Sequence, residues 1–164
     1  MASTRILGID PGTIRCGWAV IERSGNQLVH AASGVITPQQ KAPMSERLLE
    51  IHAGISEVVR LWAPNETSIE MVYHGLNAQT AIKLGQARGA ALIAIAAYGL
   101  PVHEYEASVV KQRTTGLGNA SKEQVRSMVA LMFRLPDDMI LDRSDALAIA
   151  VCHARQHPLL KVSR

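Results

Sequence analysis

The order of apolar runs and turn signals in this 164-residue chain predicts an α/β fold, a mixed β-sheet with helices on both faces. Three strand-like runs follow one another before residue 40, which indicates an antiparallel meander. Two alternations of helix and strand come next, and the last part of the chain is helical with breaks. The predicted order is βββ-α-β-α-β-ααα, with five strands.

The meander rests on three segments near the N-terminus. Residues 5–10 (RILGID) form a short apolar run that ends on an acid, and PGT then marks a tight turn. Residues 17–22 (GWAVIE) resume as a strand, and 28–37 give a third. Between these two, the SGN sequence at 24–26 is typical of a hairpin turn, so we expect antiparallel pairing.

The middle of the chain alternates between helix and strand. Apolar residues recur at helical spacing over 48–62, and the short β-like run 67–72 follows. Asn77 is a suitable N-cap for a long Ala-rich helix that extends to about residue 98. Residues 101–105 complete the predicted sheet as its fifth strand.

The rest of the chain is predicted to be helical. A short helix begins near residue 107, a second covers 121–135 and a last one covers about 142–157. Ser121 and Gln124 have the spacing of a capping box, which supports the start of the second of these helices.

Length and composition narrow the class of protein. The chain suits one domain over residues 1–164, and no linker is evident. The longest apolar stretch, 90–98, is about half of a membrane span, and no secretory signal is visible, so we expect a cytoplasmic protein without a membrane partner. Cys16 and Cys152 cannot form a disulfide framework and are expected to be buried.

The charge balance is mildly basic. The chain has 17 Lys and Arg against 14 Asp and Glu, a formal net charge of +3. This value permits a polyanionic partner without demonstrating one.

Four acidic residues lie at positions that suggest a metal-binding or catalytic site. Asp10 ends the first predicted strand, and Glu70 lies near the end of the apolar run SIEMV. Asp142 and Asp145 are three residues apart at the start of the last helix, so they share one helix face and repel each other. A carboxylate within an apolar strand is costly to bury unless it is paired or bound to a cation.

Four converging carboxylates would form an all-oxygen cage that suits Mg²⁺ or Mn²⁺ rather than zinc. Two such ions can activate a water and stabilise the leaving oxygen of a phosphodiester, which indicates a nuclease or phosphoryl transferase. Three of the acids also have a structural interpretation when taken alone, whereas Glu70 is the least easily explained in structural terms. Asp10 before Pro-Gly is a turn former, Asp142 an N-cap and Asp145 a favourable first-turn acid.

Four long motifs together resemble the RuvC family of bacterial Holliday-junction resolvases, in order and over almost the whole chain. They are GIDPGTIRCGWAV (8–20), IEMVYHGLNAQTAIKLGQARG (69–89), VKQRTTGLGNASKEQV (110–125) and DRSDALAIAVCHA (142–154). The resemblance implies an RNase H-like fold whose second strand is antiparallel to its neighbours. It also implies a cytoplasmic homodimer that cuts two symmetric strands of a four-way DNA junction in recombination and repair. The family's branch-migration partners, RuvA and RuvB, are implied as well.

The resemblance assigns roles to individual residues. The family's catalytic, metal-binding acids correspond to a set of four here: Asp10, Glu70, Asp142 and Asp145. Some relatives have His where this chain has Asp142. Tyr73 falls where the family has an aromatic residue that stacks on bases, although an aromatic at a strand end can also close a hydrophobic edge. Lys111 and Lys122 match lysines that bind DNA or offset transition-state charge.

The sequence does not decide the roles of several other polar and small residues. Residues 105–135 carry five basic against two acidic side chains, and the glycines of TTGLGNASK allow a phosphate to approach the backbone. Arg113, Arg126 and Lys83 fit either DNA contact or an ordinary solvated surface.

Three histidines lack metal-like spacing and are expected to be structural or exposed: His74, His103 and His153. Ala81, Gly85 and Gly89 form a stripe of small residues that suits packing on the sheet or across a dimer.

Three other functions would fit parts of the pattern. A ribosomal-RNA-processing nuclease on the same fold would usually be shorter and lack the VKQ…GLG…SK stretch. An actin-like ATPase or sugar kinase shares the GIDPGT-like phosphate loop but needs two such domains around the nucleotide. A non-catalytic DNA-binding protein would not need the four acids.

Overall fold

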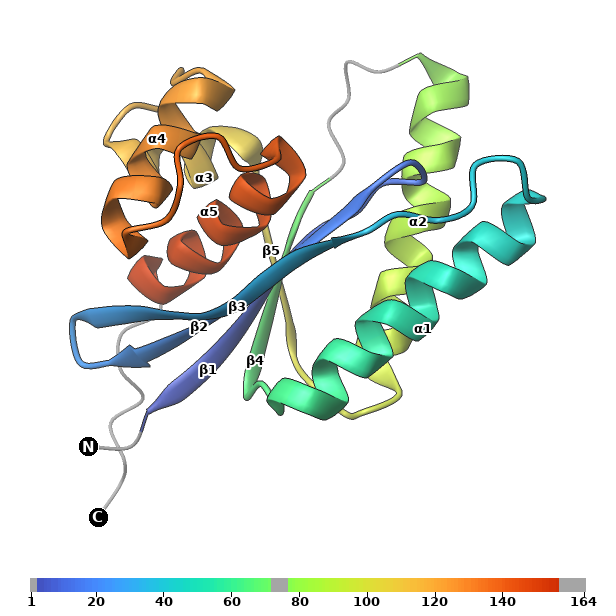
Figure 1. Ribbon diagram of the computed structural model, residues 1–164, viewed down its shortest axis with the longest axis horizontal. Coiled ribbons are helices and arrows are strands. Elements are labelled where there is room, and N and C mark those ends of the chain that lie inside the picture. The colour runs from blue at the N-terminus through green and yellow to red at the C-terminus, as the bar shows by residue number, and fades with distance from the viewer. Residues whose placement is uncertain (1–2, 72–76, 157–164) are drawn as a thin grey trace.

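The computed structural model describes residues 3–71 and 77–156, which form one five-stranded sheet with helices on both faces (Figure 1). The strands lie in the order β3-β2-β1-β4-β5. β2 runs antiparallel to β1 and β3, whereas β4 is parallel to β1 and β5. This arrangement confirms the predicted mixed sheet and its antiparallel second strand. The strands are β1 (Thr4–Asp10), β2 (Cys16–Ser24), β3 (Gln27–Ile36), β4 (Glu66–Glu70) and β5 (Val102–Tyr105).

The helices divide between the two faces of the sheet (Figure 1). One face carries α1 (Met44–Trp62) and α2 (Ala78–Ala96), and the other carries α3 (Ala107–Thr115), α4 (Lys122–Phe133) and α5 (Leu141–Gln156). No helix in the described ranges is both long enough and apolar enough to span a bilayer.

Local sequence signals account for several element boundaries. Gly25 adopts φ +61° in the two-residue turn between β2 and β3, as a hairpin with glycine at its first turn position requires. The Asn77 side chain accepts a hydrogen bond from the Thr80 amide and caps α2. At the start of α4, Ser121 and Gln124 form the predicted capping box.

The core has two parts, one on each face of the sheet. Alternate side chains of the central strand point to opposite sides, so Leu7 and Ile9 pack under α1 and α2 while Ile6 packs under α5. Cys16 and Cys152 are both fully buried, as predicted. α5 is buried almost all round, because it lies between the sheet and the α3–α4 pair.

Two glycines allow α5 to lie directly on the sheet backbone. A Cβ atom on Gly8 would lie 2.3 Å from the carbonyl oxygen of Ala146, and one on Gly17 would lie 1.9 Å from that of Asp142. Neither distance leaves room for a side chain, so any other residue would push α5 away. The glycine in β2 therefore fixes the height of the first turn of α5 above the sheet.

A buried polar cluster holds the other end of α5. His153 is fully buried, and its Nδ1 lies 2.7 Å from the Tyr105 hydroxyl. Its Nε2 lies 2.5 Å from a carboxylate oxygen of Glu66. The His103 ring packs against the His153 ring at a tilt of 36°, with a centroid distance of 4.4 Å. Burial raises the pKa of Tyr105 to about 12, so the phenol keeps its proton and can donate it to His153. His153 therefore has a structural role, one of the two alternatives that the sequence left open.

Replacing His153 with Ala is expected to destabilise the fold by about 3 kcal/mol, because Glu66 and Tyr105 would lose a buried hydrogen-bond partner. In thermal unfolding this cost should lower Tm by roughly 6–12 °C. The half-buried His52 of α1 provides the control, and His52→Ala should cost less than about 1 kcal/mol. Equal losses for the two variants would show that the cluster contributes no stability of its own.

Candidate active site

The sheet places Asp10 and Glu70 side by side. β1 and β4 are parallel, with Ile9 paired to Ile69, so the next residue of each strand lies at the same edge of the sheet. Asp10 and Glu70 thus end two adjacent strands. This is the edge of a parallel pair where active sites of α/β proteins commonly form.

The first turn of α5 brings the other two acids over this edge. α5 begins at Leu141, so Asp142 and Asp145 are both inside the helix rather than before it. The alternative interpretation of Asp142 as the N-cap is therefore wrong. The charges of Asp145, Glu70 and Asp142 all raise the pKa of the buried Asp10, as expected for acids of β1, β4 and α5 that lie near one another, and we call these four residues the acidic cluster.

Burial and mutual repulsion make the charged form of the cluster costly. Burial, followed by the charges of Asp145 and Glu70, raises the pKa of Asp10 well above its ordinary value. Burial and the charge of Asp145 raise the pKa of Glu70. Burial also raises the pKa of Asp145, although Lys122 opposes the shift. The positive charge near the cluster is therefore too small to balance the negative charge of its carboxylates.

Two basic side chains partly offset this charge. Lys122 Nζ donates a hydrogen bond to Asp145 Oδ2 at 2.9 Å. Although burial opposes it, that bond raises the pKa of Lys122, so the ammonium stays charged. Arg15 Nη1 lies 3.9 Å from Asp142 Oδ2, a looser contact. Lys111 joins Lys122 in lining a cavity of about 150 Å³ beside Glu70 and Asp145.

The donor set suits a hard divalent cation, but the side chains as placed do not converge on one point. Within the described ranges, no three Asp, Glu, His or Cys side chains form a cluster that could hold a metal ion. Asp145 is turned toward Lys122, and Asp142 is oriented toward Arg15. Carboxylate oxygens are nevertheless the ligands that Mg²⁺ and Mn²⁺ prefer, and the raised pKa values of Asp10 and Glu70 mark a site that a cation would stabilise.

The other residues that the sequence analysis singled out do not belong to the acidic cluster. Tyr73 and His74 lie outside the described residues. Lys83 is exposed on α2 and lines a cavity beside Asp142. Arg113 lies in the last turn of α3, where its carbonyl accepts a hydrogen bond from Arg155. Arg126 lies on α4 with its Nε atom buried.

Sequence reasoning missed two features of the site. Gly17 sets the position of Asp142, because its backbone lies against that of the first turn of α5. In the sequence, the only indication of this role is that Gly17 belongs to the motif GIDPGTIRCGWAV. Arg15 lies beside Asp142, although the two are far apart in the sequence. No periodicity or motif spacing could have revealed that pair.

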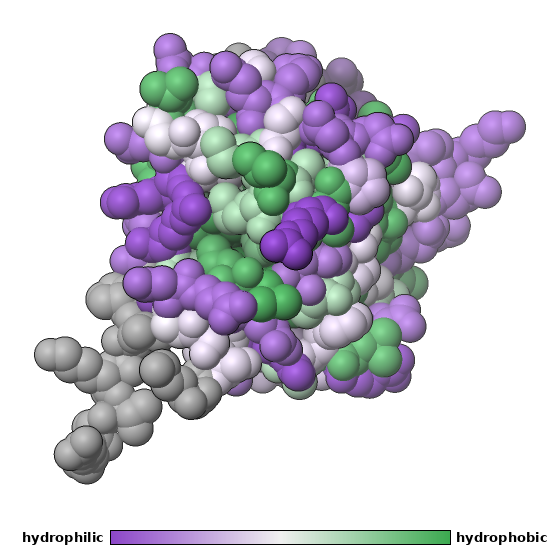
Figure 2. All heavy atoms as spheres, turned by 60° about the vertical axis from the view of Figure 1, so that its left-hand side comes forward, coloured by the Kyte–Doolittle hydropathy of each residue, from purple (hydrophilic) through white to green (hydrophobic). Residues whose placement is uncertain are grey.

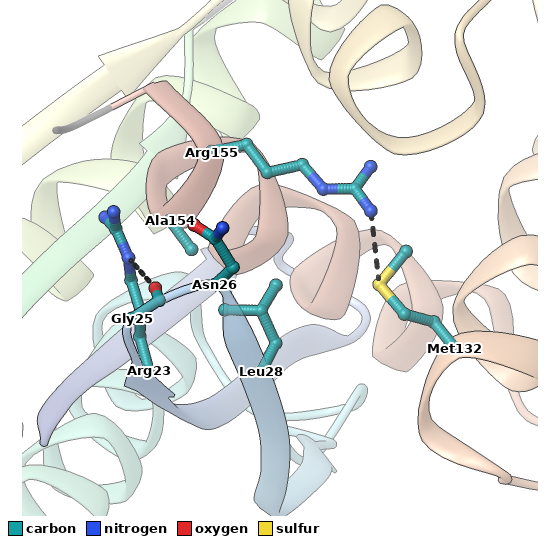
Figure 3. Close-up of a pocket in the computed structure, with 7 residues that line it drawn as sticks. All are labelled: Arg23, Gly25, Asn26, Leu28, Met132, Ala154 and Arg155. Carbon is teal, nitrogen blue, oxygen red and sulfur yellow. Dashed lines mark hydrogen bonds between the residues drawn. The ribbon is translucent and has the colours of Figure 1, made fainter.

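Two other surface features lie away from the acids. Figure 2 shows the side of α3, α4 and α5, where apolar side chains gather near the centre among hydrophilic ones. Leu117 and Leu131 are exposed large apolar residues in this part of the chain. A cavity of about 380 Å³ lies at the β2–β3 turn. Figure 3 shows the side chains that line it, Arg23 and Arg155 among them. Arg155 lies at the opposite end of α5 from Asp142, so this cavity is separate from the acidic cluster.

The strand order, with two acids at adjacent strand ends and two on the helix above, defines a protein of the RNase H-like class, whose nuclease members cut nucleic-acid backbones. Within that class the sequence is more specific. The family described as "Crossover junction endodeoxyribonuclease RuvC" matches residues 6–153, and the chain belongs to this family.

Individual relatives agree with this assignment. The crossover junction endodeoxyribonuclease RuvC of Geobacter sulfurreducens is 46% identical over 160 residues, which cover 98% of each chain. The structure of Thermus thermophilus RuvC in complex with Holliday junction substrate aligns with a TM-score of 0.86 and 33% identity, over 92% of this chain and 93% of that one. The yeast mitochondrial Holliday junction resolvase, at 11% identity and a TM-score of 0.68 over 93% of this chain and 79% of that one, shares the fold.

Proposed function

We propose that this protein is a structure-selective endonuclease that resolves Holliday junctions by paired, symmetric hydrolysis of phosphodiesters. The observation that carries the proposal is the gathering of four acids, Asp10, Glu70, Asp142 and Asp145, at one edge of the sheet. Its family membership and the junction-bound Thermus thermophilus relative support the choice of substrate.

The four carboxylates would hold the divalent cations, two Mg²⁺ or Mn²⁺ ions in our proposal. Such ions supply an activated water and stabilise the departing 3′ oxygen. Asp10 and Glu70 end strands that pair within the sheet, so the backbone that carries both carboxylates is fixed. Lys122 and Lys111, on the α3–α4 side, would offset charge that develops on the phosphate.

The contacts with DNA are proposed to be mostly to phosphates, so that junction shape rather than base sequence sets binding. Lys111 and Lys122 would contribute to this surface, and Tyr73 would stack on bases near the junction centre. A nick with a 5′ phosphate and a 3′ hydroxyl would remain ligatable.

One acidic cluster on one 164-residue nuclease domain cuts one strand, so we propose that paired cleavage needs a homodimer. A Cβ atom on Gly85 or Gly89 of α2 would meet nothing within 4 Å, so there is open space beside α2 at these two glycines. It would be available to a second copy. The branch-migration proteins RuvA and RuvB would act with the dimer in the bacterial cytoplasm.

Without divalent cations, Asp10→Asn is expected to make the protein more stable at pH 7. The raised pKa of Asp10 means that ionisation is disfavoured in the folded state. The resulting penalty is absent below the ordinary carboxyl pKa, grows as pH rises toward the folded-state pKa and is complete above it. Removing it should add about 1 kcal/mol, or roughly 2–4 °C in Tm.

The same Tm measurement in Mg²⁺ gives the control. Cations that bind the wild-type cluster would stabilise it by mass action, so the advantage of Asp10→Asn should shrink or reverse. An Asn variant that is less stable than wild type in chelator at pH 7 would contradict the electrostatic account.

The proposed substrate is tested by comparing cleavage of a four-way junction, a linear duplex of the same sequence and a structured RNA. We expect cleavage of the junction at least about a hundredfold faster than that of the other two, because only the junction matches the shape that the family recognises. Preferential cleavage of the RNA would favour the ribosomal-RNA-processing alternative instead.

A further inference from the structure

A second cavity flanks the acidic cluster on the side opposite Lys111 and Lys122. Its volume is about 590 Å³, and it is open to the surface beside Asp142. One wall is the loop between β1 and β2, and the other is the N-terminal half of α2. Its lining residues are Gly12, Thr13, Ile14, Arg15, Thr80, Lys83, Leu84 and Asp142.

Two basic side chains in this cavity are available to a ligand. Arg15 is exposed, and its guanidinium lies 3.9 Å from Asp142, beyond hydrogen-bond distance. An exposed ion pair with such a gap is weak, so Arg15 can exchange partners at low cost. Lys83 is exposed on α2 and makes no hydrogen bond or ion pair with another described residue.

The cavity also has an apolar part. The Ile14 side chain is 62% exposed in the loop between β1 and β2. Leu84 is half-buried on the facing wall. Cationic groups beside exposed apolar ones are the combination that a nucleotide needs, since its phosphate is anionic while its sugar and base have apolar surfaces.

The two cavities lie on either side of the carboxylates. Asp145 and Glu70 line the cavity that contains Lys111 and Lys122, whereas Asp142 lines the one that contains Arg15 and Lys83. A DNA strand whose scissile phosphate lies at the acids must extend past them in both directions. The second cavity is where the strand would leave on the Asp142 side.

We propose that Arg15 and Lys83 bind the phosphate of the cleaved strand that neighbours the scissile one on the Asp142 side. This inference rests on the proposed nuclease function and deepens it. Arg15 moves from the carboxylate of Asp142 to the phosphate when the strand enters, and its planar guanidinium suits a bidentate phosphate contact. Ile14 and Leu84 contact the sugar or base of the same nucleotide.

Junction binding at a series of salt concentrations tests the phosphate contacts. All proteins carry Asp10→Asn, so that no substrate is cut and binding alone is measured. Lys83→Gln and Arg15→Gln should each weaken binding about three- to tenfold at 100 mM salt and reduce the magnitude of the salt slope by about 1. Arg15→Lys should keep the slope but lose affinity, since the charge remains and the bidentate geometry does not.

Arg60→Gln is the matched control, because Arg60 is exposed near the far end of α1 and loses the same charge. Salt slopes for Lys83→Gln and Arg15→Gln that equal that of Arg60→Gln would overturn the proposal. Thermal unfolding of each variant should match that of its parent, which ensures that binding is compared between folded proteins.

A neutral methylphosphonate, placed in turn at each phosphate flanking the cut, locates the contact. At one flanking position the methylphosphonate should weaken binding by the parent protein and have little further effect on Lys83→Gln, because both remove the same interaction. Purely additive losses at every flanking position would refute the assignment. The binding measurements do not depend on cleavage. Failure of the wild-type protein to cut junctions would therefore count against the proposed nuclease function and not against these phosphate contacts.

Discussion

Asp10→Asn is expected to abolish junction cleavage, with a loss of at least about a thousandfold, the scale seen when one member of a cooperating catalytic set is removed. Asp10 ends β1 beside the end of β4, and burial together with the charges of Asp145, Glu70 and Asp142 raises its pKa. The amide keeps the size of the side chain but removes the negative charge that a divalent cation requires. Single-turnover cleavage of a labelled four-way junction measures the loss.

Junction binding by the same variant should be largely unchanged, because in our proposal the contacts to phosphates come from basic side chains rather than from the acids. Asp138→Asn is a suitable control, since Asp138 is an exposed acid outside the cluster, and it should cut at the wild-type rate. Near-wild-type cutting by Asp10→Asn would show that the cluster is not the catalytic centre.

Gly17→Ala is expected to destabilise the protein by at least about 3 kcal/mol, which corresponds to a fall in Tm of roughly 6–12 °C. The added methyl would lie 1.9 Å from the carbonyl oxygen of Asp142, a backbone atom that cannot move unless α5 moves. The shift would carry Asp142 and Asp145 away from Asp10. Variants that still fold should therefore cut junctions at least about a hundredfold more slowly, because small displacements of reacting groups are costly.

Gly118→Ala provides the comparison for stability. A Cβ atom there would lie 3.5 Å from the carbonyl oxygen of Ser108, an ordinary contact distance, so its Tm should stay within a few degrees of wild type. Similar Tm values for the two alanine variants would mean that α5 does not need Gly17 to approach the sheet.

The elements that depend on local signals could be predicted from the sequence. The SGN turn, the Asn77 cap and the Ser121–Gln124 capping box each act within a few residues, and each has the predicted role. α1 begins at Met44 rather than near residue 48, because its first turn is mostly polar and adds little to the apolar periodicity. Helix ends of this kind are often uncertain by a few residues.

The placement of Asp10 and Glu70 at one sheet edge followed from their positions at strand ends. The interactions between distant segments could not be predicted. Lys122 pairs with Asp145, and Arg15 faces Asp142, through approaches that only the folded chain sets. His153 was expected to be structural or exposed, but its partners Tyr105 and Glu66 come from two strands and have no shared sequence signal.

The most direct test of the central claim is cleavage of a mobile four-way junction labelled on each strand, with Mg²⁺, with Mn²⁺ and with chelator. We predict two symmetric nicks on opposite strands, with 5′ phosphate and 3′ hydroxyl ends, in either cation and none in chelator. Undiminished cutting in chelator, or nicks on one strand only, would contradict the account of a metal-dependent junction resolvase.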